Sequence, residues 1–317
     1  MTSWVKGFAS GVKDFVVDKT FGTTDELSLY KKGKKIGSGA FGQVYICEKD
    51  GKQFAYKEMD ASDNGTLNDL KREYLLVQKL KGQPNVLHFE FGSHDKNNQT
   101  VVLISELING IDLEKLIYSD VSITIPQIKW ITAQLLTGLL SMSVADIVHF
   151  DVKPSNIMIT YDYKVKYIDF GTSLEIGTTI PALTITANYA NRNIREIVNK
   201  GKPVTITEDM KKYDLWCVGC TLYELYNRNF LFKSVNDKDH PKQLRNYETN
   251  FSSQGSNFFN INDTEEEVKM NEFFKFFMKT KFEQMPELQE VLEHEWIKDF
   301  VNLNLELHKK DIIPDDN

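Results

Sequence analysis

Three glycines give the sequence its sharpest chemical signal. Gly37, Gly39 and Gly42 are spaced G-x-G-x-x-G, and a backbone without side chains can approach phosphate oxygens closely. In a dinucleotide-binding fold, such glycines precede a helix whose N-terminus holds the pyrophosphate. Here a strand-like run, Val-Tyr-Ile-Cys, follows at 44–47, and helical periodicity begins only after residue 64. We therefore expect a hairpin flap over nucleotide phosphates, and a nucleotide-binding oxidoreductase has no other support in the chain.

A carboxylate within an apolar helical stripe is the second signal. Residues 66–81 repeat apolar side chains at helical spacing, and Gly82 and Pro84 end the pattern. Glu73 falls on this stripe. Because a carboxylate close to a buried face requires a cation, we expect Glu73 to meet a basic side chain.

Short motifs in a fixed order resemble those of eukaryotic-type protein kinases, and the resemblance covers roughly residues 30–300. Gly37–Val44 matches the G-x-G-x-x-G-x-V flap of that family, and Phe-Ala-Tyr-Lys at 54–57 resembles its V-A-I-K strand. In the family, this lysine holds the α- and β-phosphates of ATP and pairs with a glutamate on the next helix. The resemblance therefore assigns Lys57 and Glu73 to that pair.

The catalytic motifs follow in the second half of the chain. Residues 149–156, His-Phe-Asp-Val-Lys-Pro-Ser-Asn, resemble the loop H-R-D-x-x-x-x-N, and Asp169 opens a D-F-G sequence. Phosphoryl transfer needs chiefly an aligned hydroxyl and neutralised charge. The resemblance implies that Asp151 accepts or orients the proton of the substrate hydroxyl and that Lys153 stabilises the transferring phosphate. It also implies that Asn156 and Asp169 hold Mg²⁺ between phosphate oxygens.

The resemblance also implies an ATP site. The hinge that meets adenine would lie near residues 106–108, Asp112 would reach the ribose, and the small Ser105 would be the gatekeeper, leaving a back pocket open. The expected ATP contacts are Gly37, Ser38, Gly39, Ala40, Phe41, Gly42, Val44, Ala55, Lys57, Ser105, Glu106, Ile108, Asp112 and Met158. The expected catalytic residues are Lys57, Glu73, Asp151 and Lys153, with Asn156 and Asp169 as metal ligands and ATP and Mg²⁺ as cofactors.

The acceptor hydroxyl is expected to belong to serine or threonine. Lys153 lies two residues after Asp151, and Thr186 resembles the threonine that contacts both in serine/threonine kinases. We predict a serine/threonine protein kinase that transfers the γ-phosphoryl group of ATP to protein substrates. The alternative is a pseudokinase scaffold that binds ATP or partners without transfer. Scaffolds usually lose at least one of the motif residues that are all intact here.

Two departures from the family concern the activation segment. Phe150 replaces the arginine before the catalytic aspartate, which defines a non-RD type, and no Lys or Arg lies between Asp169 and Asn191. A phosphate on that segment would lack its usual partners, so we predict that activity does not require its phosphorylation. The A-P-E glutamate falls near Asn193 or Glu196, and its arginine partner is replaced by Met285. Because losing both members of a buried ion pair can be nearly neutral, we expect a reorganised substrate-binding segment.

Positioning these motifs requires an α+β fold of two lobes, the protein kinase fold, with a small β-rich lobe before a larger helical one. The aspartate of Asp-Leu-Trp-Cys-Val-Gly at 214–219 resembles the family residue that braces the catalytic loop, and Leu292–Ile297 resembles the closing L-x-H-x-W-I. We expect a hairpin near 157–168, a central buried helix over 215–232 and a polar insertion over 234–268. The predicted divisions are a leader at 1–28, a kinase domain at 29–303 with lobes 29–108 and 109–303, and a polar tail at 304–317.

The leader has its own pattern. Trp4, Phe8, Val12 and Phe15 recur at the spacing of one apolar helix face. This face could pack against the kinase domain, dock a partner or lie on a membrane surface. The small excess of basic residues in the first twenty positions offers little electrostatic help for membrane anchoring.

Composition limits the class of protein. Lys+Arg 38 against Asp+Glu 45 gives a net charge of -7, which offers no general attraction for nucleic acid. No apolar run is long enough for a transmembrane span, and no signal peptide is apparent. Cys47, Cys217 and Cys220 are odd in number and lie among apolar residues, which indicates a reducing, cytoplasmic setting. We read the last two as buried core rather than a metal half-site. The oligomeric state is not predicted.

Overall fold

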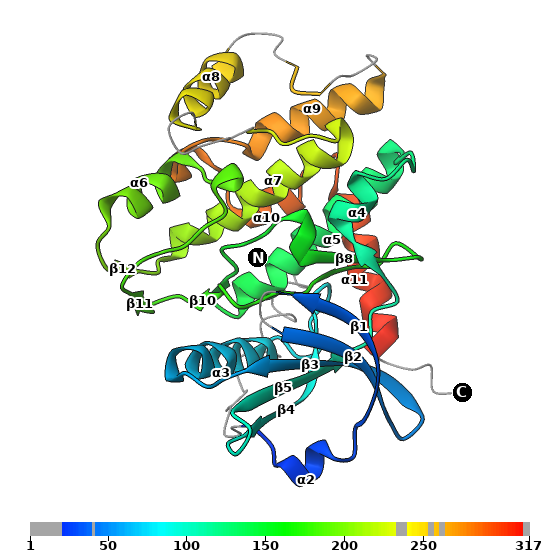
Figure 1. The fold of residues 1–317 in the computed structure, drawn as a ribbon. Coiled ribbons are helices and arrows are strands. Elements are labelled where there is room, and N and C mark those ends of the chain that lie inside the picture. The colour runs from blue at the N-terminus through cyan, green and yellow to red at the C-terminus, as the bar shows by residue number, and fades with distance from the viewer. Residues whose placement is uncertain (1–20, 40–41, 233–239, 253–256, 260–263, 313–317) are drawn as a thin grey trace.

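The computed structural model describes residues 21–39, 42–232, 240–252, 257–259 and 264–312, which form two lobes (Figure 1). The apolar face of the leader, Trp4 to Phe15, and the flap residues Ala40 and Phe41 lie outside the described residues. Within the part of the chain that is described, no helix is long and apolar enough to cross a membrane. The expected order, a sheet lobe before a helical lobe, is confirmed.

The first lobe is built on one antiparallel sheet. Its five strands are ordered β1-β2-β3-β5-β4. The helix expected at 66–81 begins two residues earlier, because the Asp63 side chain caps it by accepting a hydrogen bond from Thr66 N at 2.8 Å. The elements are α2 (Thr24–Leu27), β1 (Lys31–Gly39), β2 (Gly42–Lys49), β3 (Lys52–Asp60), α3 (Asn64–Lys79), β4 (Phe89–Asp95) and β5 (Thr100–Glu106).

The two faces of this sheet are buried in different clusters. Val101 and Leu103 on β5 join the large core that continues into the second lobe. Val102 and Ile104 alternate with them and pack with Tyr30 in a smaller cluster. Because successive side chains of a strand point to opposite faces, the Tyr30 cluster covers the face of the sheet opposite to α3.

The second lobe is mainly helical and carries short strand pairs at its boundary with the first. The hairpin expected near 157–168 is confirmed as β8 and β9, and it forms a three-stranded sheet with β6. The strands are β6 (Gly110–Asp112), β7 (Ile147–Val148), β8 (Ile157–Thr160), β9 (Val165–Tyr167), β10 (Leu174–Glu175), β11 (Thr179–Ile180) and β12 (Val204–Thr205). The helices are α4 (Leu113–Ile117), α5 (Ile125–Val144), α6 (Arg192–Lys200), α7 (Lys211–Asn227), α8 (His240–Ser252), α9 (Glu265–Phe277), α10 (Leu288–Leu292) and α11 (Lys298–Ile312), with single 3-10 turns at Pro154–Asn156, Ala187–Tyr189, Glu208–Met210 and Phe282–Gln284.

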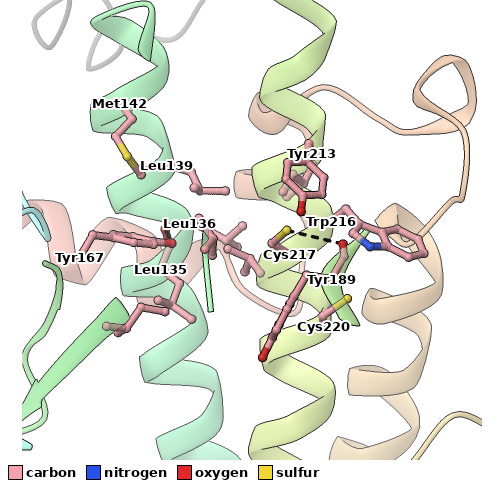
Figure 2. Close-up of a cluster of buried hydrophobic side chains, with 14 of the residues drawn as sticks. Leu135, Leu136, Leu139, Met142, Tyr167, Tyr189, Tyr213, Trp216, Cys217 and Cys220 are labelled. Carbon is pink, nitrogen blue, oxygen red and sulfur yellow. Dashed lines mark hydrogen bonds between the residues drawn. The ribbon is translucent and has the colours of Figure 1, made fainter. Parts of the chain in front are cut away.

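The helices α5 and α7 form the centre of this lobe, and Figure 2 shows the side chains between and around them. The central buried helix predicted at 215–232 is α7, displaced by about one turn toward the N-terminus; it ends where Arg228 adopts a positive φ of 52°. Cys217 and Cys220 are 0% and 1% exposed, so their interpretation as core residues is confirmed. The Cys217 thiol donates to Tyr189 O at 3.8 Å. Among the described residues, no cluster of three or more His, Cys, Asp or Glu side chains could hold a metal ion.

Two predicted segments are more ordered than their sequences indicate. The insertion expected over 234–268 contains α8, whose Leu244 and Tyr247 are buried. The tail expected from residue 304 continues α11, which packs against α5 and reaches toward the sheet lobe (Figure 1). Asn304 is buried and donates to Asn85 Oδ1 at 2.7 Å, so a polar side chain is satisfied inside the fold rather than by water.

Candidate active site

The glycine flap is a β-hairpin. Strands β1 and β2 pair antiparallel with Gly37 opposite Val44, Ser38 opposite Gln43 and Gly39 opposite Gly42. Gly42 has a φ of 146°, and a Cβ there would lie 2.1 Å from Glu58 O, so the position requires glycine. The hairpin expected from the sequence is confirmed, and no helix follows the glycines as a dinucleotide site would require.

Lys57 and Glu73 face each other between β3 and α3. Lys57 Nζ lies 3.9 Å from Glu73 Oε1. Glu73 is 4% exposed, and Oε1 has no hydrogen-bond partner among the described residues. Burial raises the pKa of Glu73, which the nearby Lys57 charge opposes. The cation expected beside Glu73 is therefore present, at a distance longer than a hydrogen bond.

Two contacts between α3 and the D-F-G region were not predicted from the sequence. Arg72 Nη2 donates to Gly171 O at 3.1 Å, and Lys79 Nζ lies 2.5 Å from Glu175 Oε2. Both basic residues lie on the same helix as Glu73. They tie α3 to the segment that follows Asp169, and their partners are too distant in sequence for any local pattern to indicate.

The Asp214 side chain holds the backbone of the catalytic loop in place. This buried carboxylate at the start of α7 accepts hydrogen bonds from His149 N at 2.6 Å and Phe150 N at 3.0 Å. Burial raises the pKa of Asp214 to about 7, against the effect of these two donors. Phe150 is fully buried and has a φ of 63°. This backbone conformation costs free energy and persists only where the surrounding structure holds it. Burial also lowers the pKa of His149 to about 4, so its ring is neutral at pH 7.

Asp151 is surrounded by donors. Its carboxylate lies 2.7 Å from Lys153 Nζ and accepts from Thr186 Oγ1 at 2.6 Å and Asn156 Nδ2 at 2.7 Å. Lys153 Nζ also donates to Thr186 Oγ1 at 3.1 Å. Burial alone would raise the pKa of Asp151, but the hydrogen bonds from Lys153 and Thr186 outweigh it and lower the pKa below its ordinary value. Asp151 is therefore an ionised acceptor at neutral pH.

Asn156 and Asp169 offer the oxygens that Mg²⁺ prefers. The Asn156 amide nitrogen donates to Asp151 O at 2.9 Å as well as to its carboxylate. Because only the nitrogen end can donate, the amide oxygen points away from Asp151. Asp169 Oδ1 accepts from Gly171 N at 3.0 Å, which fixes the orientation of the carboxylate. One amide and one carboxylate fit a Mg²⁺ that takes its remaining ligands from phosphates and water.

These groups share one cavity of about 570 Å³. Its wall combines residues of β3, the catalytic loop and the D-F-G sequence with Glu73 and with three earlier residues of α3, Thr66, Asp69 and Leu70, which the sequence did not indicate. The lining residues are Lys57, Thr66, Asp69, Leu70, Glu73, Asp151, Lys153, Ser155, Asn156, Asp169, Gly171 and Thr172.

The residues expected around adenine and ribose lie on neighbouring strands. Ala55 on β3 pairs with Ser105 at the end of β5, and Asp112 pairs with Met158 across β6 and β8. The Asp112 carboxylate caps α4 and lies 2.6 Å from Lys115 Nζ.

Two further hinge positions complete this side of the site. The Glu106 carboxylate lies 2.6 Å from Lys166 Nζ, which holds its side chain in an ion pair. Ile108 is half-buried and packs against the core.

The altered A-P-E region is connected by other bonds. Asn193, where the family glutamate was expected, accepts from Phe282 N at 3.0 Å through its side-chain oxygen. Its neighbour Arg192 lies 2.9 Å from Glu248 on α8. A neutral hydrogen bond and an ion pair therefore hold α6 to the distal part of the lobe.

Comparison with known proteins agrees with this geometry. Residues 30–297 match the protein kinase domain family. Mitogen-activated protein kinase kinase kinase 3 of Arabidopsis thaliana is 29% identical over 241 residues, covering 68% of this chain and 37% of the relative. The cyclin-dependent kinase 4 homolog of Caenorhabditis elegans is 26% identical over 249 residues, covering 75% and 60%. Serine/threonine-protein kinase KIC1 of Saccharomyces cerevisiae is 28% identical over 211 residues, covering 66% and 19%. The chain spans less than two thirds of the length of each relative, and by its match over most of its own length it belongs to the protein kinase family.

Proposed function

We propose that this protein is a serine/threonine protein kinase that transfers the γ-phosphoryl group of ATP to hydroxyls of protein substrates. The observation that carries this proposal is the ionised carboxylate of Asp151, which contacts Lys153, Thr186 and Asn156. It lines the same cavity as Lys57 and Asp169. An acceptor for a proton, cations for phosphate oxygens and oxygen ligands for a metal are thus collected around one space.

Each side chain has a definite task in this proposal. Asp151 accepts or orients the proton of the attacking hydroxyl, and Lys153 neutralises charge on the phosphoryl group as it moves. Lys57 binds the non-transferred phosphates, and Glu73 holds the ammonium group in position. Asn156 and Asp169 would hold Mg²⁺, which would neutralise charge on the phosphates when bound.

The preference for serine and threonine is supported by the contact of Thr186 with both catalytic side chains. Thr186 Oγ1 accepts from Lys153 and donates to Asp151. This triangle fixes the substrate-binding segment beside the catalytic loop, where a short aliphatic hydroxyl can reach Asp151. Its residue types are those that the serine/threonine subfamily uses at these positions.

The test is phosphate transfer from labelled ATP with Mg²⁺ to a generic protein substrate. We compare the wild type with Asp151→Asn, which keeps the shape of the side chain and removes its charge. Asp162→Asn is the matched control, because the Asp162 side chain is 66% exposed on the turn between β8 and β9. We expect transfer by wild type and Asp162→Asn, and a loss of at least 100-fold in Asp151→Asn.

Phosphoamino-acid analysis of the product then identifies the acceptor hydroxyl. Phosphotyrosine alone would contradict the proposed specificity. Nucleotide binding without transfer by the wild type would favour the scaffold, and equal transfer by wild type and Asp151→Asn would refute the role of Asp151.

A further inference from the structure

A short segment before the family match lies against the sheet lobe. Gly22 N donates to Gly92 O at 2.8 Å, and Gly22 forms a parallel bridge with Ser93 on β4. The helix α2 follows with a capping box between Thr23 and Glu26, and Tyr30 then enters the smaller core cluster. The segment 21–30 is therefore anchored at both of its ends, although the family match begins only at residue 30.

Phe21, at the start of this segment, contacts α3. Its ring lies 5.3 Å from the ring of Tyr74, centroid to centroid, and Tyr74 in turn stacks on Phe89 of β4 at 6.0 Å. A Cβ at Gly92 would lie 2.9 Å from the Phe21 ring and 2.8 Å from that of Tyr74. The two rings can approach because position 92 has no side chain. Tyr74 directly follows Glu73 in the chain, so the aromatic contact is made at the turn of α3 that carries the catalytic glutamate.

The position of α3 needs such support because its inward carboxylate is costly to bury. Glu73 Oε1 is buried without a hydrogen bond in the described structure, and its nearest cation is 3.9 Å away. A buried carboxylate with incomplete pairing disfavours the conformation that buries it. Contacts elsewhere on α3 must offset this cost, and two of them, Gln78 to Phe89 O and Lys79 to Glu175, lie toward its C-terminal end.

We propose that Phe21 is a positioning residue that holds α3 in the orientation that brings Glu73 to Lys57. The proposal rests on the proposed kinase function for its kinetic consequence. Removing the Phe21 ring shifts α3 toward orientations in which Glu73 leaves Lys57, and the phosphate-binding lysine loses its partner. Phe21 does not line the cavity that holds Lys57 and Asp151, so it acts through Tyr74 and Glu73.

The experiment compares Phe21→Ala with Phe21→Leu and two controls in the same segment. Leu27→Ala removes apolar contact from the Tyr30 cluster, on the other face of the sheet. Leu29→Ala changes a residue that is 56% exposed. From the usual energy of an aromatic pair we expect kcat/KM for ATP to fall roughly 3- to 10-fold in Phe21→Ala. Phe21→Leu should retain most of the wild-type kcat/KM, and kcat/KM of both controls should remain within about 2-fold of the wild-type value.

A double-mutant cycle separates positioning from simple loss of stability. If Phe21 acts through Glu73, then Phe21→Ala should have little further effect on nucleotide Kd or kcat/KM in a Glu73→Gln background. The same fold-loss in both backgrounds would overturn the proposal. An equal kinetic loss in Leu27→Ala, compared at matched loss of Tm, would also overturn it.

Amide hydrogen exchange tests the positioning role of Phe21 without depending on catalysis. Phe21→Ala should accelerate exchange in α3 more than Leu27→Ala does. If the wild type transfers no phosphate, the proposed function fails, while nucleotide Kd and exchange in α3 still decide whether Phe21 positions the helix. Unchanged exchange in α3 together with unchanged nucleotide Kd would overturn the positioning role.

Discussion

Replacing Thr186 by valine removes one hydroxyl from the catalytic triangle at almost constant volume. The hydroxyl donates to Asp151 at 2.6 Å and accepts from Lys153 at 3.1 Å. A hydrogen bond to a charged group contributes about 1.5–3 kcal/mol. If that free energy aligns Asp151 in the transition state, kcat should fall about 10- to 100-fold. The KM for ATP should change little, since Thr186 is not among the residues that line the cavity shared by Lys57 and Asp169.

The pH profile provides a second readout of the same change. Hydrogen bonds from Lys153 and Thr186 hold the pKa of Asp151 below its ordinary value against the effect of burial. Without the Thr186 bond that pKa rises, so the acidic limb of kcat/KM should move to higher pH in Thr186→Val.

Thr186→Ser, which keeps the hydroxyl, should recover most of the activity, and Thr184→Val is the control on an exposed threonine of the same segment. A Thr186→Val enzyme within 2-fold of wild type, with an unmoved acidic limb, would refute the reasoning. Equal losses in Thr184→Val would show that the segment as a whole, and not this hydroxyl, is responsible.

Three further predictions concern the activation segment, the gatekeeper residue Ser105 and two buried histidines. Phosphatase treatment should leave the activity unchanged, because no Lys or Arg lies between Asp169 and Asn191 to hold a phosphate. Loss of activity on phosphatase treatment would contradict this. Glu175→Gln should cost no more than about 5-fold in activity, since the ion pair of Glu175 with Lys79 is partly exposed. The small, buried Ser105 should admit ATP-competitive compounds with a large aryl group that Ser105→Met excludes; equal affinity for both proteins would disprove an open back pocket. The pKa values of His88 and His149 are each lowered to about 4, mainly by burial. Since the unfolded chain takes up these protons near pH 6.5 and the folded chain only near pH 4, each histidine should lower the free energy of unfolding by about 2 kcal/mol between pH 7 and pH 5. Urea titrations should show that the free energy of unfolding of His149→Gln, relative to the wild type, increases by about 2 kcal/mol from pH 7 to pH 5. An identical pH dependence in wild type and variant would contradict the assignment.

The catalytic residues could be predicted from short motifs, because several of them lie close together in the sequence. Asp151, Lys153 and Asn156 lie within one loop, so their order alone predicts that they share a site. Glu73 was predictable for a different reason: a charge on an apolar helical stripe requires a partner. The lobes followed from the change in periodicity from strand to helix.

The elements that escaped prediction depend on partners far away in the chain. Asn304 is polar and was assigned to a solvated tail, yet it is buried because Asn85 accepts its hydrogen bond across most of the domain. Polar composition likewise concealed α8, which is fixed by only a few buried side chains such as Leu244 and Tyr247. Neither the Arg72–Gly171 bond nor the substitute bond of Asn193 to Phe282 has a local signature.

The absence of basic residues from the activation segment has a practical consequence for mass spectrometry. Trypsin cleaves after lysine and arginine, and the sites that flank this segment are Lys166 and Arg192. In the folded protein both side chains are held in ion pairs, with Glu106 and Glu248. After denaturation, residues 167–192 should be released as one peptide that contains every threonine of the segment, Thr186 included. The mass of this one peptide would therefore report how many phosphates the activation segment carries.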